Sequence, residues 1–61
     1  MRLKELRTEK VATQKEVADY ICCSPLVYSR YERGEREPDI DTLGKLADYF
    51  NVSIDYLVER Q

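Results

Sequence analysis

Apolar residues recur at helical spacing in five separate segments of the chain. The pattern predicts helices from the N-terminus to about Lys10, from Gln14 to Ile21, over residues 25–33, from Ile40 to about Asn51, and in a short segment after Ser53. The alternation of apolar and polar residues that is typical of a half-buried strand is missing. No linker or repeat divides the sequence. We therefore expect residues 1–61 to form a single, compact all-α domain of five helices.

Capping residues set the predicted boundaries of these helices. Thr13 can accept a backbone N–H while Glu16 reaches back to the Thr13 amide, which forms a capping box. Ser24 can cap the next helix, with Pro25 at its first position, where the missing N–H has no cost. The other boundaries are marked by the C-capping Gly34 and by the N-capping Asp39 and Ser53.

The connection between the second and third helices is too short for an ordinary loop, because only Cys22 and Cys23 precede the Ser24 cap. At about 100° per residue, the third helix has two distinct faces. One face carries Pro25, Leu26, Ser29, Arg30 and Arg33, and the other carries Val27, Tyr28 and Tyr31. A short turn followed by a helix with one exposed face is the arrangement with which a protein lays a helix in a DNA groove.

The fourth helix carries the most regular apolar stripe. The stripe consists of Ile40, Leu43, Leu46, Ala47 and Phe50. Gly44 lies within this helix and disfavours helix formation by about 1 kcal/mol relative to alanine. We therefore expect a reason for glycine at this position, namely close packing against a neighbouring helix.

The chain resembles the phage repressor and Cro family of helix-turn-helix proteins. The resemblance rests on Thr13-Gln14, Val17-Ala18, Cys23-Ser24, Tyr28-Ser29-Arg30, Glu32, Gly34 and Pro38, and it continues through Leu43, Leu46-Ala47, Phe50, Val52-Ser53 and Asp55-Tyr56-Leu57. It covers nearly the whole chain. It implies a lambda repressor-like fold, in which the second and third helices form the helix-turn-helix, and a protein that binds double-stranded DNA.

The resemblance also implies roles for individual residues. The positions expected to read bases are Pro25, Leu26, Ser29 and Arg30, and those expected to contact phosphates are Gln14, Lys15, Arg33 and Arg36. An arginine can bind guanine O6 and N7 together. Proline and leucine have no hydrogen-bonding side chain, although Leu26 can pack on a thymine methyl, so the sequence predicts modest specificity or a dependence on DNA shape.

Three further residue sets follow from the same resemblance. Arg7 and Glu32 match a partly buried ion pair that ties the first helix to the end of the third. Tyr49, Tyr56, Val58 and the C-terminal tail are candidates for a homodimer interface, with the alternative that Tyr56 and Leu57 only close the core. Cys22 matches a turn position that needs a positive φ, at a cost of about 1 to 2 kcal/mol, and Cys23 matches a small core residue.

The overall charge argues against DNA binding, because ten basic and twelve acidic residues give a net charge of −2 and a pI near 5.0. The distribution is uneven. Residues 1–36 contain eight of the basic and six of the acidic residues. Residues 37–61 contain two basic and six acidic residues. The basic excess therefore coincides with the motif, although any one of these charges is as easily a solvated surface residue.

The composition predicts no cofactor, metal ion or small-molecule ligand. The chain has no histidine, and two adjacent thiols neither complete a tetrahedral zinc site nor easily reach disulfide geometry. An oxidation switch at these cysteines stays an open alternative. A catalytic nucleophile beside a base and a glycine-rich phosphate loop are both missing, so we expect no enzyme. With no long apolar run and no signal peptide, a cytoplasmic location is expected.

The sequence therefore predicts a dimeric, sequence-specific transcriptional regulator, with repression as the expected action. The third helix, about residues 25–33, would enter the major groove of an inverted-repeat operator whose half-sites lie about one helical turn apart. One alternative is a protein-interaction module, such as an antitoxin-like partner, that binds through Leu26 or the C-terminal apolar residues. Another is a domain of a longer regulator.

Overall fold

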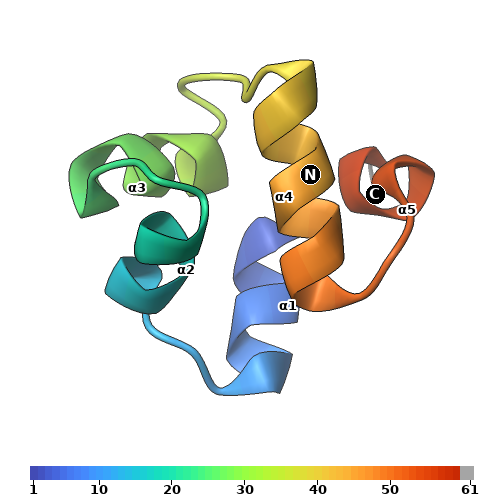
Figure 1. Ribbon diagram of the computed structural model, residues 1–61, viewed down its shortest axis with the longest axis horizontal. Coiled ribbons are helices and arrows are strands. Elements are labelled where there is room, and N and C mark those ends of the chain that lie inside the picture. Colours follow the sequence, from blue (N-terminus) through green and yellow to red (C-terminus); the bar gives the residue numbers. More distant parts are fainter. Residues whose placement is uncertain (60–61) are drawn as a thin grey trace.

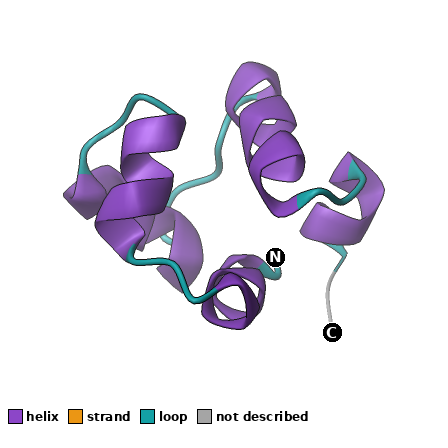
Figure 2. Ribbon diagram, turned by 60° about the horizontal axis from the view of Figure 1, so that its bottom comes forward, coloured by secondary structure: helices purple, strands orange, loops and turns teal. Residues whose placement is uncertain are grey.

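Five helices follow one another in the computed structural model, which describes residues 1–59 (Figure 1). They are α1 (Leu3–Lys10), α2 (Gln14–Tyr20), α3 (Pro25–Arg33), α4 (Ile40–Phe50) and α5 (Ile54–Val58). Figure 2 shows only helices and loops over this part of the chain, which contains no strand. The all-α, five-helix prediction is confirmed. No helix within residues 1–59 is long and apolar enough to cross a bilayer.

The predicted caps form the expected hydrogen bonds. Thr13 Oγ1 accepts the Glu16 backbone N–H at 3.1 Å, and the Glu16 carboxylate accepts the Thr13 N–H at 3.1 Å, which completes the capping box. Side chains of three further caps accept backbone N–H groups, Ser24 from Val27, Asp39 from Thr42 and Ser53 from Tyr56. Each bond pairs a donor that the first turn of a helix otherwise leaves free. Local sequence therefore determines where α2 to α5 begin.

The core lies between the five helices: α3 and α4 pack on α2, α1 packs on α3 and α4, and α5 packs on α4. Tyr28 of α3 is the largest side chain that is completely buried. The buried cluster comprises Leu3, Leu6, Val17, Ala18, Ile21, Tyr28, Tyr31, Leu46, Phe50 and Leu57. Figure 1 shows α2 and α3 together on one side of α4, with α5 on the other side. The two helices of the expected helix-turn-helix thus share one flank of the molecule.

The two ends of the described chain are joined through Arg2. Its backbone N–H donates to the Leu57 carbonyl at 3.1 Å, and its guanidinium lies 4.9 Å from the centre of the Tyr56 ring. The same guanidinium forms ion pairs with Glu5 at 3.8 Å and Glu59 at 3.7 Å. These contacts hold the short α5 against the start of α1.

The tight turn between α2 and α3 has the predicted left-handed residue, because Cys22 has a φ of 61°. Cys23 is half-buried against the core, as expected for a small core residue, and burial raises the pKa of its thiol. No sequence signal indicated a second strained position. Val11 ends α1 with a φ of 57° although it is β-branched, and its side chain is 88% exposed.

Two predictions for α4 are wrong. Ile40 is 78% exposed and does not join the apolar stripe, because the first turn of α4 lies beside the α3–α4 loop rather than among the other helices (Figure 1). Gly44 makes no close helix contact, since a Cβ placed there meets no atom within 4 Å. The glycine is therefore not required by packing.

We expect Gly44→Ala to raise the free energy of unfolding by about 1 kcal/mol, because alanine favours the helix and the space for its methyl group is free. Urea denaturation followed by circular dichroism measures the change. Gly34→Ala is the matched control and should destabilise the chain, since Gly34 has a φ of 75°. A loss of stability in Gly44→Ala would show that this position needs glycine.

Candidate nucleic-acid interface

The α3 helix turns one face inward and leaves the opposite face in solvent. Tyr28 and Tyr31 are buried, whereas Pro25, Leu26 and Arg30 are exposed. Ser29 is half-buried at the edge of the exposed face. The Ser24 cap and the two-cysteine turn set the angle at which α3 leaves α2. The residues expected to read bases therefore lie on the first two turns of one helix.

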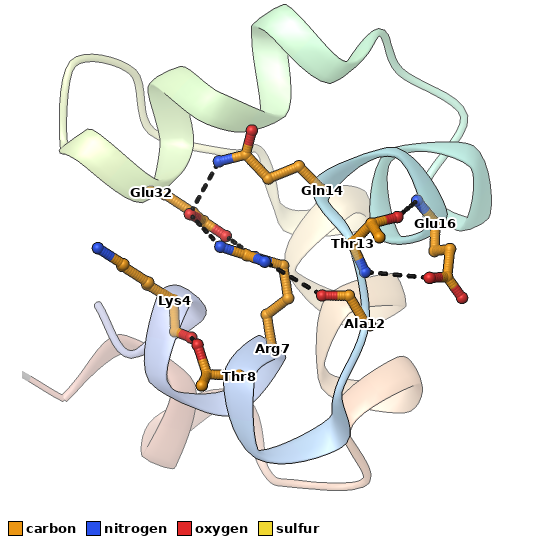
Figure 3. A network of polar contacts seen from close by, with 8 residues as sticks. All are labelled: Lys4, Arg7, Thr8, Ala12, Thr13, Gln14, Glu16 and Glu32. Carbon is orange, nitrogen blue, oxygen red and sulfur yellow. Dashed lines mark hydrogen bonds and ion pairs between the residues drawn. The ribbon is translucent and has the colours of Figure 1, made fainter.

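Arg7 on α1 and Glu32 on α3 form an ion pair that joins these two helices (Figure 3). Arg7 Nε donates to Glu32 Oε2 at 2.6 Å, and Arg7 Nη2 donates to Oε1 at 3.4 Å. The Glu32 side chain is only 5% exposed. Arg7 Nη1 also donates to the Ala12 carbonyl at 3.1 Å, so the same guanidinium holds the connection between α1 and α2.

Gln14 is the third member of this cluster. Its Nε2 donates to Glu32 Oε1 at 3.1 Å, which turns the amide nitrogen inward (Figure 3). The sequence indicated that Gln14 opens α2 but not that its amide binds Glu32. A primary amide has two N–H groups, so one stays available for a ligand. The carboxylate therefore determines which way the Gln14 amide faces.

The cluster shifts the ionisation of its members. Burial alone raises the pKa of Glu32, but the hydrogen bonds from Arg7 and Gln14, together with the nearby Tyr28 hydroxyl, outweigh it and leave this pKa below its ordinary value. The hydrogen bond with Glu32 raises the pKa of Arg7. Burial and the same carboxylate raise the pKa of the Tyr28 hydroxyl. Glu32 is therefore charged, and Tyr28 neutral, at physiological pH.

The candidate phosphate-contacting cations differ in their surroundings. Lys15 pairs with Asp19 at 3.0 Å, and Arg33 pairs with Glu35 at 2.9 Å, both at the surface. Exposed ion pairs of this kind contribute at most about 1 kcal/mol to the stability of the fold, so a phosphate can replace the carboxylate at little cost. Arg36 lies in the loop after α3, beside a cavity of about 690 Å³ that Arg2 and Val58 also border.

The dimer candidates are not together on one surface. Tyr49 is half-buried, with its ring centre 5.0 Å from that of Tyr20 and 5.1 Å from the Lys10 ammonium. Tyr56 and Val58 on α5 are 44% and 38% exposed. Ile54, which the sequence predicted only as part of α5, is a further apolar residue of this helix with 41% exposure. The C-terminal tail beyond Glu59 lies outside the described residues.

The sequence comparisons of this chain with known proteins all point to the same family. The sequence profile described as helix-turn-helix matches residues 3–57. The transcriptional regulator ImmR of Bacillus subtilis (strain 168) is 49% identical over 57 residues, which are 93% of this chain and 45% of ImmR. The SPbeta prophage-derived uncharacterized regulator YonR of the same strain is 41% identical over 95% of this chain and 54% of YonR.

A third relative comes from another bacterium. The cryptic phage CTXphi transcriptional repressor RstR of Vibrio cholerae is 37% identical over 93% of this chain and 51% of RstR. The chain thus spans about half the length of these relatives. No solved structure gives a significant match.

The Arg7–Glu32 pair predicts a specific dependence of stability on pH. The folded-state pKa of Glu32 lies below its ordinary value of 4.5. The charged Glu32 carboxylate therefore contributes to the free energy of unfolding above pH 4.5, and this contribution is lost as the pH falls through the folded-state pKa. We expect Glu32→Gln to lower the free energy of unfolding at neutral pH and to make its decline below pH 4.5 shallower. Urea titrations at a series of pH values measure both effects.

The control for this experiment is Leu46→Val, which truncates a completely buried core residue and removes no carboxylate. This variant should be less stable at every pH while keeping the slope of the parent chain. A slope in Glu32→Gln equal to that of the parent would contradict the assignment of the acid dependence to Glu32.

Proposed function

Because this chain belongs to the helix-turn-helix family, we propose that it is a sequence-specific regulator of transcription that binds double-stranded DNA, with repression as its action. The observation that carries the proposal is the exposed face of α3, which is held in place by the helix caps and by a partly buried ion pair. The similarity to RstR, which is named a transcriptional repressor, supports the direction of regulation. Residues 1–61 would form one DNA-binding domain in the cytoplasm.

In this proposal, α3 enters the major groove with its first turns facing the bases. Pro25 and Leu26 lie at the N-terminal end of the helix, with Ser29 and Arg30 one turn further on. Arg30 has no ion pair with any residue of the described chain, so its guanidinium is free to bind guanine O6 and N7. Arg30 would therefore be the main hydrogen-bonding base reader.

Phosphate contacts would set the position of the domain on the duplex. Gln14 has one N–H left after its bond to Glu32, and this group would donate to a phosphate oxygen next to α2. Lys15 and Arg33 would exchange their exposed carboxylate partners for phosphates, and Arg36 would approach the backbone from the loop after α3. The acidic α5 would stay away from the DNA, because it lies on the side of α4 opposite α3 (Figure 1).

A two-fold operator would be bound by a homodimer. We propose self-association through the exposed apolar residues of α5, with Ile54 and Val58 about one turn apart on one side of the helix and Tyr56 on another side. Tyr49 would take part only after release from Lys10 and Tyr20. The operator would then be an inverted repeat with half-sites about one helical turn apart.

A second candidate function rests on the same exposed helix face. Leu26 is 61% exposed and the chain has a net charge of −2, which also fits a protein-binding module or antitoxin-like partner. The two candidates differ in their response to salt. Each phosphate neutralised by a cation contributes about −0.9 to the slope of log affinity against log salt, whereas an apolar protein contact has no such dependence.

In vitro selection of duplexes bound by the chain tests DNA binding, half-site spacing and base preference together. We expect Arg30→Ala to lose preference at one base position of each half-site, at a cost of about 1 to 3 kcal/mol. Gln14→Ala should weaken all selected sites alike, because it removes a phosphate contact. An Arg30→Ala preference profile identical to that of the parent would refute the reader role, and no binding at low salt would refute the proposal.

Sedimentation equilibrium tests self-association of the chain. We expect a monomer–dimer equilibrium that Val58→Glu shifts to monomer, because a carboxylate would be placed in an apolar contact. Ile40→Glu is the matched control, since Ile40 is a similarly apolar residue that is 78% exposed on another helix, α4. A parent chain that stays monomeric at high concentration would remove the dimer from the proposal.

A further inference from the structure

A cavity of about 690 Å³ lies where three segments that are distant in the sequence meet. It is bordered by the start of α1, by the loop between α3 and α4, and by the end of α5. Its volume lies within the range of about 300 to 1,000 Å³ that is typical of sites for small ligands. The composition of the chain predicts no such ligand, but the cavity forms only when these segments pack together, so no local sequence pattern indicates it.

The lining of this cavity has an apolar floor and a mainly charged rim. Tyr31 and Pro38 are buried and Leu43 is half-buried, so these side chains form the floor. The charged side chains of the lining, all of them exposed except that of Arg2, are those of Arg2, Arg36, Glu5, Glu37 and Glu59. A ligand that fits this cavity therefore needs an apolar part for the floor and polar groups that suit charges of both signs.

The two arginines of the rim have free hydrogen-bonding capacity. Arg2 Nε is buried without a hydrogen-bond partner, and the ion pairs of this guanidinium with Glu5 and Glu59 are 3.8 and 3.7 Å long, which is beyond hydrogen-bond distance. A buried donor without an acceptor is unfavourable, so Arg2 gains a bond when it turns toward an acceptor in the cavity. Arg36 forms no ion pair with any other residue in the described part of the chain.

The three glutamates restrict the charge of the ligand. A phosphate or a dicarboxylate beside Arg2 would also meet Glu5 and Glu59, which repel it. A single carboxylate beside Arg36, combined with an ammonium group beside a glutamate, balances both signs. An amino acid or a short peptide has these two groups together with a side chain for the floor.

We propose that this cavity binds a small zwitterion of the amino-acid type, a free amino acid or a short peptide, that has an apolar side chain. Its carboxylate pairs with Arg36, and its ammonium group pairs with Glu37. Its side chain contacts Tyr31 and Leu43, and Arg2 turns an N–H toward a ligand oxygen.

The place of the cavity in the fold gives ligand binding a consequence for DNA. Arg36 is one of the residues proposed to contact phosphate, and it lies on the rim of the cavity. A ligand carboxylate that pairs with Arg36 competes with the DNA backbone for the same guanidinium. We therefore expect the ligand to weaken DNA binding. This consequence rests on the proposed function, whereas occupation of the cavity does not depend on DNA.

Titrations followed by proton–nitrogen correlation NMR spectra test the site in the absence of DNA. The probes are leucine and the tripeptide alanyl-leucyl-alanine. We expect the backbone amide signals of residues 34–38 and of α5 to shift, and the probe that binds more tightly identifies the ligand as a free amino acid or a peptide. Acetylation of its amino group or amidation of its carboxylate should each weaken binding about fivefold, because each removes one exposed ion pair.

Substitutions on the rim locate the two charged groups of the ligand. Arg36→Gln and Glu37→Gln should each weaken binding of the tighter probe about fivefold. Arg33→Gln and Glu35→Gln are the matched controls, since they remove the same charges from the same stretch but do not line the cavity. Both controls should bind the probe as the parent chain does, and the dispersion of the spectra reports whether each variant is folded.

The possible results separate the site from the proposed function. With a selected duplex, the tighter probe should lower the DNA affinity of the parent chain but not that of Arg36→Gln. The absence of shifts around the cavity with both probes at millimolar concentration, or equal binding of the acetylated and amidated derivatives, would overturn the site and leave DNA binding standing. Probe binding with unchanged DNA affinity would overturn the competition for Arg36. No duplex binding at low salt would overturn the proposed function, while the NMR titration would still decide the site.

Discussion

The partly buried contact between Arg7 and Glu32 is the interaction on which the rest of the structure depends. It joins α1 to α3 across 25 residues of sequence, and the same carboxylate holds Gln14 at the start of α2. A chain of 61 residues has a small core and little stability to lose. Removal of one member of a buried ion pair strands the other charge, at a cost of about 3 to 5 kcal/mol. The orientation of α3 relative to α2 therefore rests on this pair as well as on apolar packing.

The uneven charge of the chain is compatible with the proposed interaction with a polyanion. Two of the candidate cations, Lys15 and Arg33, are paired with exposed carboxylates in the free chain. The carboxylates reduce the non-specific attraction of these cations to DNA. Because exposed ion pairs are weak in water, little free energy is lost when a phosphate replaces the carboxylate. The expected result is a domain with moderate electrostatic affinity, in which the base contacts of α3 carry more of the discrimination.

The reading surface of α3 combines one cationic side chain with an apolar one. Arg30 offers several donors in a fixed geometry, and Leu26 offers none. Because position 26 has no polar side chain, the sequence predicts modest specificity or a dependence on DNA shape. Leu26 is 61% exposed on this face and has no hydrogen-bonding group, so Arg30 is the residue proposed to distinguish the hydrogen-bonding edges of the bases.

The sequence by itself determined the features that depend on neighbouring residues. Thr13, Ser24, Asp39 and Ser53 begin helices because their side chains bond amides within the next turn. Cys22 takes a left-handed conformation because only residues 21–24 connect α2 and α3. Tertiary structure decided what depends on distant segments: whether a neighbour covers Ile40, whether any atom approaches Gly44, and that Gln14 turns its amide toward Glu32. Helical periodicity specifies a direction around the helix axis, but only the packed helices determine what lies in that direction.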